Sequence, residues 1–502
     1  MPFNSIFAWM MKKRIHQIEL FRKYPLEVQS EILLELVSTA ENTEFGKKHG
    51  FSSIKIYQDF KNQVPLNTYE SLKPLIDRVI SGDNQVLWPT ETKWFAKSSG
   101  TTSDRSKFIP VSKESLFECH YKGGKDLLAL YYENFPNRKL YNGKHLIVGG
   151  SAQINPIDID SYFGDLSAII VKNLPWWAEI RRTPSRETAL MSEWEAKIDK
   201  MARETIEEDV YILAGVPSWT YILLQKVLEI SGKEHIKEVW PNLELFLHGG
   251  VNFEPYRASF EKLIPSAEMN YVETYNASEG FFGIQDKANS NELLLMLDYG
   301  IFYEFIPMSA FNGVDSKEVV DLSEVKLNEN YAIVISTNGG LWRYILGDTI
   351  QFTSLLPFRF RITGRTKSFI NVFGEEVIVE NAEKALANAC IQTNSAIQEF
   401  TAGPVYLEEG KKGKHEWLIE FSTLPQDLNH FAEILDTELR KLNSDYDAKR
   451  YKSLLLENLS VKSIELGTFD AWLKSKGKLG GQHKIPRLSN DRKILEEIYR
   501  FC

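Results

Sequence analysis

The chain has 502 residues, which is too long for one ordinary hydrophobic core, so we expect two or more domains. Its hydrophobic content of 43% and charged content of 25% are those of a soluble globular protein. The formal net charge of −9, from 59 basic and 68 acidic side chains, argues against nucleic acid as the main partner. The 3 scattered cysteines indicate a reduced compartment without a disulfide framework, and we expect a cytoplasmic protein.

The N-terminal residues 3–11 are apolar, but they do not have the pattern of a membrane segment. No apolar run in the sequence reaches the length needed to span a bilayer. The apolar residues precede their lysines and lack a small-residue cleavage site, which is not typical of a signal peptide. We therefore expect an amphipathic first helix packed on the body of the protein, and no membrane partner.

Helical and strand patterns alternate over the first part of the chain, as they do in an α/β domain. Apolar residues recur with helical spacing over residues 26–48 and over 67–80, where Asn67 and Glu70 resemble a capping box. Strands are predicted at residues 145–149, 210–214, 243–247 and 269–272. Several of them end in glycine, serine or acidic residues, and ligands of open α/β sheets bind beyond such carboxyl ends.

Consecutive strands replace this alternation between residues 293 and 355. They are predicted at residues 293–297, 301–306, 331–337 and 342–346, and the dipeptide Asn338-Gly339 is a strong hairpin signal. This pattern indicates an antiparallel sheet or small barrel attached to the α/β body. After a boundary at residues 363–367, a helix predicted at 428–442 and shorter elements indicate a small α+β domain.

The predicted fold is therefore α/β, in two domains joined by a hinge. Residues 1–363 would form a large N-terminal α/β domain that includes the antiparallel sheet or barrel from about residue 293. Residues 364–367 would form the hinge, and residues 368–502 a small mobile α+β domain.

Residues 97–107 read Lys-Ser-Ser-Gly-Thr-Thr-Ser-Asp-Arg-Ser-Lys, a run of small hydroxyl residues around a glycine. Successive backbone N–H groups in such a turn make an anion-binding concavity, and Lys107 adds a positive charge for a phosphoryl oxygen. The run is not a P-loop, which needs Gly, four residues and then Gly-Lys-Ser/Thr. It is either a phosphate cradle or a solvated loop between two strands.

Two later segments carry carboxylates in candidate positions. In residues 273–280, Glu279 follows a strand end and suits Mg²⁺, while Tyr275 could stack on a flat ring. The alternative is that Glu279 caps a turn and Tyr275 belongs to the core. Asp348 follows a glycine at the end of a predicted strand, where it either binds ribose hydroxyls or belongs to an ordinary Gly-Asp turn.

Two further segments suggest movement. Residues 364–367 pair a glycine with long polar side chains, as a hinge or a plain linker would. Lys484 follows two glycines on a late loop, from which it could reach a distant site and neutralise charge on a phosphate during attack. Most lysines, however, are surface side chains.

Taken together and in this order, these segments resemble the GH3 family of acyl-acid amido synthetases, within the adenylate-forming, firefly-luciferase-like superfamily. Residues 44–51 resemble the N-terminal region of the family, and residues 98–107 resemble the first signature of the superfamily. Residues 273–280 are similar to the Tyr-x-x-Ser-Glu motif, and residues 344–348 to the Tyr-Arg-x-Gly-Asp motif. The resemblance covers nearly the whole chain.

The resemblance implies a role for each matching residue, with ATP and Mg²⁺ as cofactors. Lys107, Glu279 and Lys484 would be catalytic, Glu279 by holding Mg²⁺ and Lys484 as the mobile lysine that assists adenylation. Gly364 and Lys367 would form the hinge. The residues that would contact ATP or AMP are Ser98, Ser99, Gly100, Thr101, Thr102, Lys107, Gly249, Gly250, Val251, Tyr275, Ser278, Asp348 and Arg365.

The sequence departs from the family pattern at two places. Ser103 and Asp104 stand where plant members tend to have a glycine, so the loop is expected to be stiffer. Ile345 replaces the arginine of the third motif. Arg343 cannot be assumed to substitute for that arginine, because neighbouring residues on a strand point to opposite faces.

The hypothesis from the sequence is a two-step ligase that adenylates a small-molecule carboxylic acid and passes the acyl group to an amine, an amino acid being favoured. The alternatives are an acyl-CoA ligase on the same scaffold and a nucleotide-binding interaction protein that has lost catalysis. The acyl pocket is expected near residues 149–150, 216–217 and 277–278. A monomer is favoured, and the identity of the acid stays open.

Overall fold

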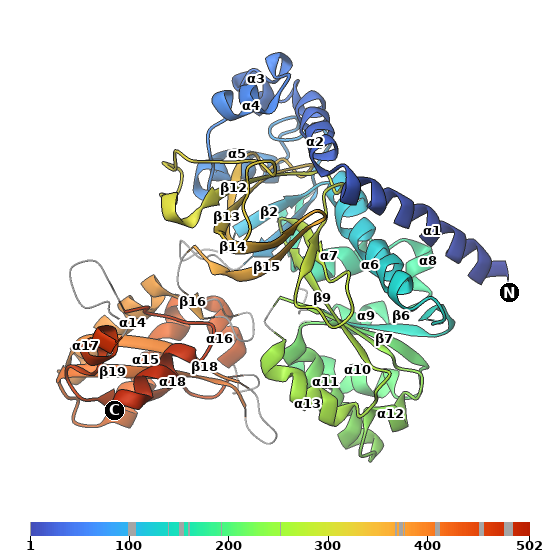
Figure 1. Ribbon diagram of the computed structural model, residues 1–502. Coiled ribbons are helices and arrows are strands. Elements are labelled where there is room, and N and C mark those ends of the chain that lie inside the picture. Colours follow the sequence, from blue (N-terminus) through green and yellow to red (C-terminus); the bar gives the residue numbers. More distant parts are fainter. Residues whose placement is uncertain are drawn as a thin grey trace. The chain divides into compact units, whose positions relative to one another are not determined.

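The computed structural model describes residues 2–98, 107–138, 140–149, 155–158, 161–191, 193–250, 253–366, 369–370, 375, 377–406, 412–450, 456–475 and 485–502. The chain divides into two compact units (Figure 1). The first comprises Met1–Ser98, Lys107–Gly250 and Glu261–Gly364. The second comprises chiefly Arg365–Cys502, together with Val251–Phe260.

Helices open the first unit: α1 (Pro2–Lys23), α2 (Pro25–Ala40), α3 (Glu44–Lys48), α4 (Tyr57–Gln63) and α5 (Tyr69–Ile80). The single helix predicted over residues 26–48 is two helices, α2 and α3. Thr43 separates them, because its hydroxyl accepts a hydrogen bond from the Gly46 N–H at 3.0 Å and so caps the start of α3. The helical periodicity continues across this break, which is why the sequence pattern did not reveal it.

The start of α5 differs from the predicted capping box. The N–H of Thr68 donates to the Ser71 hydroxyl at 3.0 Å, so the pair that closes this end lies one residue later than expected. Asn67 instead pairs with β14 (Tyr344–Leu355): its N–H donates to the Arg343 carbonyl and its carbonyl accepts from the Ile345 N–H, both at 2.8 Å. The predicted Asn67–Glu70 capping box was therefore wrong, because the backbone of Asn67 forms a β-bridge with β14, far along the chain.

A four-stranded sheet in the first unit has the order β2-β1-β5-β4. Its strands are β1 (Trp94–Ser98), β2 (Lys107–Val111), β4 (Asn155–Asp158) and β5 (Ser161–Gly164). β1 and β2 are antiparallel, with Ser98 opposite Lys107. The connection between these two strands, residues 99–106, lies outside the described residues.

The central sheet of the first unit has eleven strands among the described residues, in the order β12-β13-β14-β15-β11-β10-β9-β8-β7-β3-β6. The parallel strands are β3 (Lys144–Val148), β6 (Arg182–Thr183), β7 (Val210–Gly215), β8 (Leu245–Gly249) and β9 (Asn270–Ala277). The other strands are β10 (Gly280–Ile284), β11 (Leu293–Leu295), β12 (Ile301–Pro307), β13 (Asn330–Thr337), β14 and β15 (Phe358–Arg365). The sequence predicted an attached antiparallel sheet or barrel from about residue 293. In the structure those strands belong to the same sheet as the parallel strands, because β9 pairs antiparallel with β10 and so connects the two parts.

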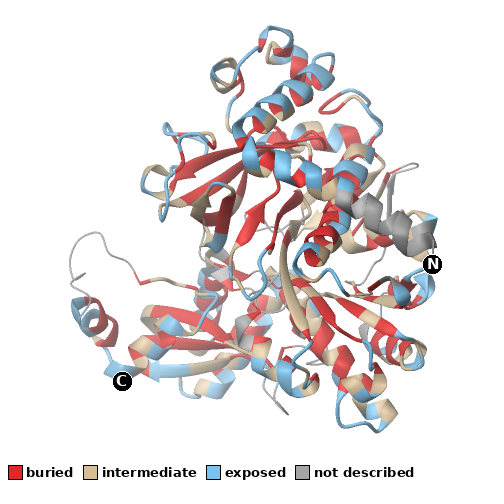
Figure 2. Ribbon diagram, turned by 45° about the vertical axis from the view of Figure 1, so that its right-hand side comes forward, coloured by how far each residue is buried: buried red, intermediate tan, exposed pale blue. Residues whose placement is uncertain are grey.

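The remaining helices before the strands of residues 270–365 are α6 (Tyr121–Asn134), α7 (Leu166–Lys172), α8 (Trp176–Glu179), α9 (Arg186–Ala189), α10 (Trp194–Thr205), α11 (Pro217–Ser231), α12 (Ile236–Val239) and α13 (Glu254–Leu263). The first part of α13, up to Phe260, belongs to the second unit. A π-helical turn, Ser115–His120, leads into α6. The core follows the central strands, which are red over much of their length in Figure 2. Trp342 is fully buried there, and its indole N–H donates to the Leu87 carbonyl at 3.1 Å.

The second unit contains a sheet with the order β18-β19-β20, formed by β18 (Ala396–Val405), β19 (Lys414–Thr423) and β20 (Ser460–Ile464). Its other elements are β16 (Phe369–Ile370), β17 (Val377–Ile378), α14 (Val379–Thr393), α15 (Leu428–Leu442), α16 (Ser444–Arg450), α17 (Thr468–Ser475) and α18 (Lys493–Ile498). α15 has the predicted bounds. Its apolar side chains Phe431, Leu435 and Leu439 are buried, as the helical spacing requires.

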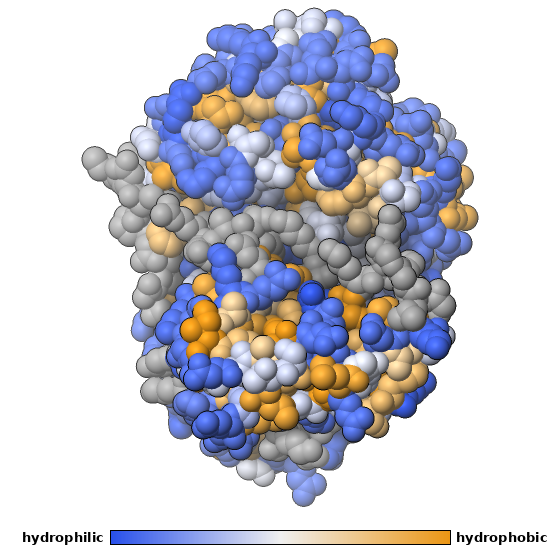
Figure 3. Space-filling view, turned by 90° about the vertical axis from the view of Figure 1, so that its left-hand side faces the viewer, coloured by the Kyte–Doolittle hydropathy of each residue, from blue (hydrophilic) through white to orange (hydrophobic). Residues whose placement is uncertain are grey.

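The face of the protein in Figure 3 carries many hydrophilic side chains, with apolar residues in scattered groups among them. Large exposed apolar side chains such as Trp176, Ile391 and Leu424 come from different elements. Every helix in the described part of the chain is too short or too polar to cross a lipid bilayer. Each of the three cysteines is a free thiol.

Candidate functional site

The carboxyl ends of four parallel strands form one row in the first unit. Val148 of β3 lies opposite Gly215 of β7, which lies opposite His248 of β8, which lies opposite Glu273 of β9. One residue further, Gly249 lies opposite Thr274. In a parallel sheet all these ends point to the same edge, where open α/β proteins bind their ligands.

Two glycines keep side chains away from this edge. A Cβ atom on Gly249 would lie 2.4 Å from the Thr274 carbonyl oxygen, and one on Gly215 would lie 2.8 Å from the Val148 carbonyl oxygen. Gly250 follows with a φ of +81°, in the left-handed region that favours glycine. The backbone at the end of β8 is therefore bare, as close approach to a ligand requires.

The segment 273–280 is a strand and a tight turn. The sequence predicted that the strand ends at residue 272, but β9 continues to Ala277 because Thr274 to Ala277 pair with β10. Ser278 and Glu279 form the two-residue turn between the strands. The turn leaves Glu279 partly exposed at the tip of the β9–β10 hairpin.

Tyr275 and Asp348 meet in the structure. The Tyr275 hydroxyl donates a hydrogen bond to Oδ2 of Asp348, and both side chains are buried. The ring centroid of Tyr275 lies 4.9 Å from that of Phe282 and 6.2 Å from that of Phe360, so the ring is part of the core. The contact brings together two sequence motifs that are 73 residues apart.

Asp348 lies inside β14 and not at the end of a strand, where the sequence placed it. The preceding residue, Gly347, has a φ of +96°, which interrupts the extended strand beside the carboxylate. A carboxylate has four lone-pair directions, so it can accept hydrogen bonds from several donors at once, as the binding of ligand hydroxyl groups would require. Binding of ribose by Asp348 stays a prediction.

Arg343 has a structural role in the first unit. Its Nε and Nη2 atoms lie 2.8 Å from Oε2 and Oε1 of Glu304, and its Nη1 donates to the Val64 carbonyl at 2.6 Å. The two side chains are 4% and 1% exposed. Ile345, which stands in place of the family arginine, packs in an apolar cluster with Ile306. Arg343 therefore does not take over a ligand-binding role, since Glu304 and backbone carbonyls occupy its guanidinium.

The predicted phosphate site can be followed at its two ends. Ser98 closes β1 and Lys107 opens β2, so the two flank the loop that joins these strands. The Nζ atom of Lys107 lies 5.9 Å from the ring centroid of Tyr69, and the Tyr69 hydroxyl accepts a hydrogen bond from the Phe108 N–H at 2.9 Å. Several predicted site residues lie outside the described residues: Ser99, Gly100, Thr101, Thr102, Val251, Lys367 and Lys484. Ser103 and Asp104, where the sequence departs from the family pattern, also lie outside them.

Gly364 ends the first unit, and Arg365 begins the second. Gly364 has a φ of +146°, and both residues belong to the end of β15. The Thr363 hydroxyl donates to the Thr349 hydroxyl at 3.0 Å. The residue after Asp348 thus contacts the residue before Gly364, so the predicted ribose site and the predicted hinge begin on the same stretch of sheet.

Sequence reasoning missed two residues that support the β9–β10 hairpin. His120, in the π-helical turn, has its Nδ1 atom 3.0 Å from Oδ1 of Asn276, and the neighbouring Cys119 Sγ accepts a hydrogen bond from the Phe281 N–H at 3.2 Å. The contact between His120 and Asn276 spans 156 residues. No local pattern could indicate it, because a lone histidine in a helical segment has no spacing that identifies its partner.

Lys197 is a second functional candidate that the sequence pattern did not single out. The side chain is fully buried, and its Nζ atom donates to the Gly149 carbonyl at 3.0 Å, at the carboxyl end of β3. Burial lowers the pKa of this lysine to about 8. The predicted acyl pocket near residues 149–150 would therefore have a buried amino group beside it; Gly150 lies outside the described residues.

The donor set fits a magnesium ion that arrives with phosphate oxygens, and does not fit an independent metal site. Among the described residues no group of three or more His, Cys, Asp or Glu side chains could hold a metal ion. Mg²⁺ keeps several waters and is usually bound by one or two carboxylates plus substrate phosphates. The partly exposed carboxylate of Glu279 is suited to that arrangement.

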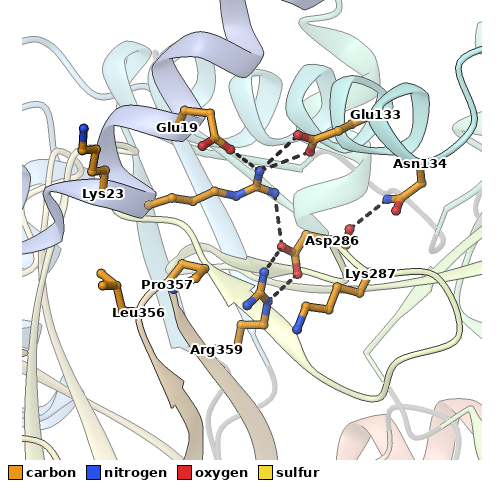
Figure 4. Close-up of a pocket in the computed structure, with 10 residues that line it drawn as sticks. Glu19, Lys23, Glu133, Asn134, Asp286, Lys287, Leu356, Pro357 and Arg359 are labelled. Carbon is orange, nitrogen blue, oxygen red and sulfur yellow. Dashed lines mark hydrogen bonds and ion pairs between the residues drawn. The ribbon is translucent and has the colours of Figure 1, made fainter.

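A separate charged cleft of about 490 Å³ lies between α1, α6 and the β10–β11 and β14–β15 connections (Figure 4). Arg22 pairs there with Glu19, Glu133 and Asp286, and Arg359 lies 2.7 Å from Asp286. These ion pairs join α1 to α6 and to the sheet. None of the described candidate site residues lines this cleft, so it is not the site to which the motifs point.

The sequence matches the family models described as GH3 family N-terminal domain, over residues 14–269, GH3 family central domain, over residues 294–365, and GH3 family C-terminal domain, over residues 380–493. It is similar to indole-3-acetic acid-amido synthetase GH3.6 of Arabidopsis thaliana, at 23% identity over 97% of this chain and 92% of that protein. It is also similar to 4-substituted benzoates-glutamate ligase GH3.12 of Arabidopsis thaliana, at 23% identity over 94% of each chain.

Two solved structures share the fold. An AtGH3.15 acyl acid amido synthetase in complex with 2,4-DB has a TM-score of 0.64 at 18% identity, and the match covers 98% of this chain and 96% of that one. A 2-hydroxyisobutyryl-CoA ligase in complex with 2-HIB-AMP and CoA has a TM-score of 0.56 at 12% identity, covering 96% and 93%.

Proposed function

Because this chain belongs to the GH3 family, we propose that it is an ATP-dependent, AMP-forming ligase that joins a small-molecule carboxylic acid to an amino acid or another amine. The names of its relatives support this proposal. They include amido synthetases of indole-3-acetic acid, a ligase of 4-substituted benzoates with glutamate and, in Nicotiana attenuata, a jasmonoyl–L-amino acid synthetase.

The observation that carries the proposal is the hydrogen bond from Tyr275 to Asp348. It joins the motif that ends in Glu279 to the motif that ends in Asp348, at the same edge as the bare glycine backbone of β8. Glu279, which would hold the metal–phosphate complex, and Asp348, which would bind the ribose, thus belong to one unit. This supports an ATP site at this edge of the sheet.

In the first step, a carboxylate oxygen of the acid attacks the α-phosphorus of ATP, and the bond to the bridging oxygen breaks to release pyrophosphate. Loop residues 98–102 and Lys107 would hold the phosphates, Asp348 the ribose, and the end of β8 the adenine. The ring of Tyr275 is packed in the core, so Tyr275 would act through its hydrogen bond to Asp348 and not by stacking on the adenine. Glu279 would hold Mg²⁺, which when bound neutralises phosphate charge. Lys484 would neutralise charge that develops during the attack.

In the second step, the amine attacks the acyl carbon of the adenylate, the carbon–oxygen bond to AMP breaks, and a proton leaves the nitrogen. We propose that residues 368–502 turn about the hinge 364–367 between the two steps, relative to the domain 1–363. The φ of +146° at Gly364 supports this location, because only glycine adopts such an angle without strain and a hinge must absorb large dihedral changes.

ATP–pyrophosphate exchange measured over a broad panel of carboxylic acids tests the first step. Exchange is expected to depend on one class of acid and to be lost in Glu279→Gln, with Glu433→Gln, an exposed residue of α15, as the matched control. No acid-dependent exchange with any acid would refute the proposal.

Mass analysis of products tests the second step. With the activating acid, ATP and a mixture of amino acids, an amide is expected; with CoA in place of the amino acids, no thioester is expected. A thioester without an amide would make the chain an acyl-CoA ligase.

We also propose a cytoplasmic monomer. Three free cysteines suit a reducing compartment. Light scattering coupled to gel filtration should give a mass close to 57.7 kDa.

A further inference from the structure

The π-helical turn Ser115–His120 holds the hairpin that carries Glu279. His120 and Cys119 are consecutive in this turn, and each makes a hydrogen bond to the hairpin, His120 to Asn276 and Cys119 to Phe281. A π-helical turn inserts a residue into a helix and so changes which side chains face a neighbour; such turns are frequent at functional sites. Here the turn presents two adjacent side chains to one hairpin.

The two hydrogen bonds reach the two strands of the hairpin, β9 and β10, at residues that are paired with each other. Asn276 of β9 and Phe281 of β10 are partners in the strand register, and the next pair, Ala277 and Gly280, closes the turn. Ser278 and Glu279 form that turn. The π-helical turn therefore holds both strands of the hairpin, with only the Ala277–Gly280 pair between these contacts and the turn that carries Glu279, the residue that we propose to hold Mg²⁺.

Packing leaves the hairpin little room to move. A Cβ atom on Gly123 of α6 would lie 2.6 Å from the Phe281 ring, and one on Gly280 would lie 2.6 Å from Cδ1 of Ile301 in β12. Phe281 and Gly280 are neighbours on a strand, so they face opposite sides of it. The hairpin is thus held by α6 on one face and by β12 on the other.

The protonation state of His120 sets the direction of its bond. Burial lowers the pKa of His120 to about 4, so the imidazole is neutral near neutral pH. A neutral ring carries one N–H, and with Oδ1 of Asn276 as acceptor that hydrogen is on Nδ1. The Asn276 oxygen would lose its donor if the ring were replaced by a hydrocarbon.

We propose that His120 is a positioning residue, which acts through Asn276 to place the Ser278–Glu279 turn for binding of magnesium–ATP. The inference rests on the proposed function, because it assigns the hairpin tip to the metal–phosphate complex. It adds a residue from a helix whose sequence carries none of the motifs discussed above. His120 itself touches neither the nucleotide nor the metal in this role.

The test is calorimetric titration of the full chain with α,β-methylene-ATP, which cannot be cleaved at the α-phosphate, in the presence of Mg²⁺ and again in EDTA. His120→Leu keeps an apolar side chain of similar bulk but removes the donor. We expect about tenfold weaker binding with Mg²⁺, in line with the loss of the donor to a partly buried acceptor, and less than a twofold change in EDTA. His120→Asn, whose amide can place a donor near the Nδ1 position, should restore most of the affinity.

Two further variants separate positioning from a general loss of structure. Tyr121→Phe removes the hydrogen bond from the next residue to the Ile170 carbonyl, away from the hairpin, and should leave binding unchanged. Asn276→Ala removes the acceptor from the other side and should reproduce the magnesium-specific loss, even if His120→Leu does not fold. In a Glu279→Gln background, His120→Leu should cause no further loss, because its effect passes through Glu279.

A loss of equal size with and without Mg²⁺, or a full additional loss in the Glu279→Gln background, would overturn the positioning role of His120. Unchanged binding in both His120→Leu and Asn276→Ala would do the same. These outcomes leave the proposed ligase intact. A wild-type chain that binds no nucleotide under either condition would instead refute the proposed function, and with it the inference.

Discussion

Replacing Arg343 with methionine should destabilise the first unit by about 3–5 kcal/mol, because it leaves the Glu304 carboxylate buried without its cation. The guanidinium makes close contacts with both oxygens of Glu304 and donates to the carbonyls of Val64 and Lys61. Both side chains are almost completely buried, so water cannot replace the lost partner. The Tyr57 hydroxyl, which also donates to Glu304 at 3.0 Å, cannot supply the missing charge.

Urea unfolding followed by tryptophan fluorescence measures this loss, with the adjacent buried Trp342 as a reporter. The double variant Arg343→Met/Glu304→Met should recover more than half of the stability, since apolar replacement of a whole buried pair is often neutral. Arg361→Met, at an exposed position of β15, should change stability by less than about 0.5 kcal/mol. A loss of less than about 1 kcal/mol in Arg343→Met, or a loss of ATP affinity without a loss of stability, would refute the structural role.

Three further predictions concern the candidate site. Lys484→Ala should slow ATP–pyrophosphate exchange at least about tenfold with little effect on nucleotide affinity, and unchanged exchange kinetics would remove its role in adenylation. Gly249→Ala should weaken nucleotide binding and lower the thermal midpoint, because its Cβ would lie 2.4 Å from the Thr274 carbonyl oxygen; a variant that binds ATP normally would contradict the close approach. Burial of His120 holds its pKa at about 4 in the folded chain, below about 6.5 in the unfolded chain, so the unfolded state binds the extra proton between these values and stability is lost as the pH falls through them. Urea midpoints at pH 7 and pH 5 should show a smaller drop for His120→Asn than for the wild type, and equal drops would contradict this linkage.

Elements with strong local signals could be predicted from the sequence. α15 has the predicted bounds because Phe431, Leu435 and Leu439 repeat with the helical period and are all buried. The site motifs were recognisable for a similar reason: glycines, hydroxyl residues and carboxylates occur at short spacings that a phosphate or metal site demands. Local sequence therefore determined the family, the order of the elements and the candidates Glu279 and Asp348.

Contacts between distant segments decided the rest. The capping box at Asn67 was wrong because β14 pairs with that residue, and the strand through residues 273–277 runs longer than predicted because β10 pairs with it. The burial of Arg343 on Glu304 and the bond from Tyr275 to Asp348 likewise join residues 39 and 73 positions apart. Such partners have no spacing in the sequence, since only the folded sheet brings their strands together.

The contact of the π-helical turn Ser115–His120 with the β9–β10 hairpin shows the same division. The residues Ser278 and Glu279 could be named from their motif, but their placement depends on a helix that begins far earlier in the chain. What the sequence determined by itself was the family and the candidate residues of the site, because short motifs identify them. What only the tertiary structure decided was which side chains hold those motifs in place, because burial and hydrogen bonding there come from segments that meet only after folding.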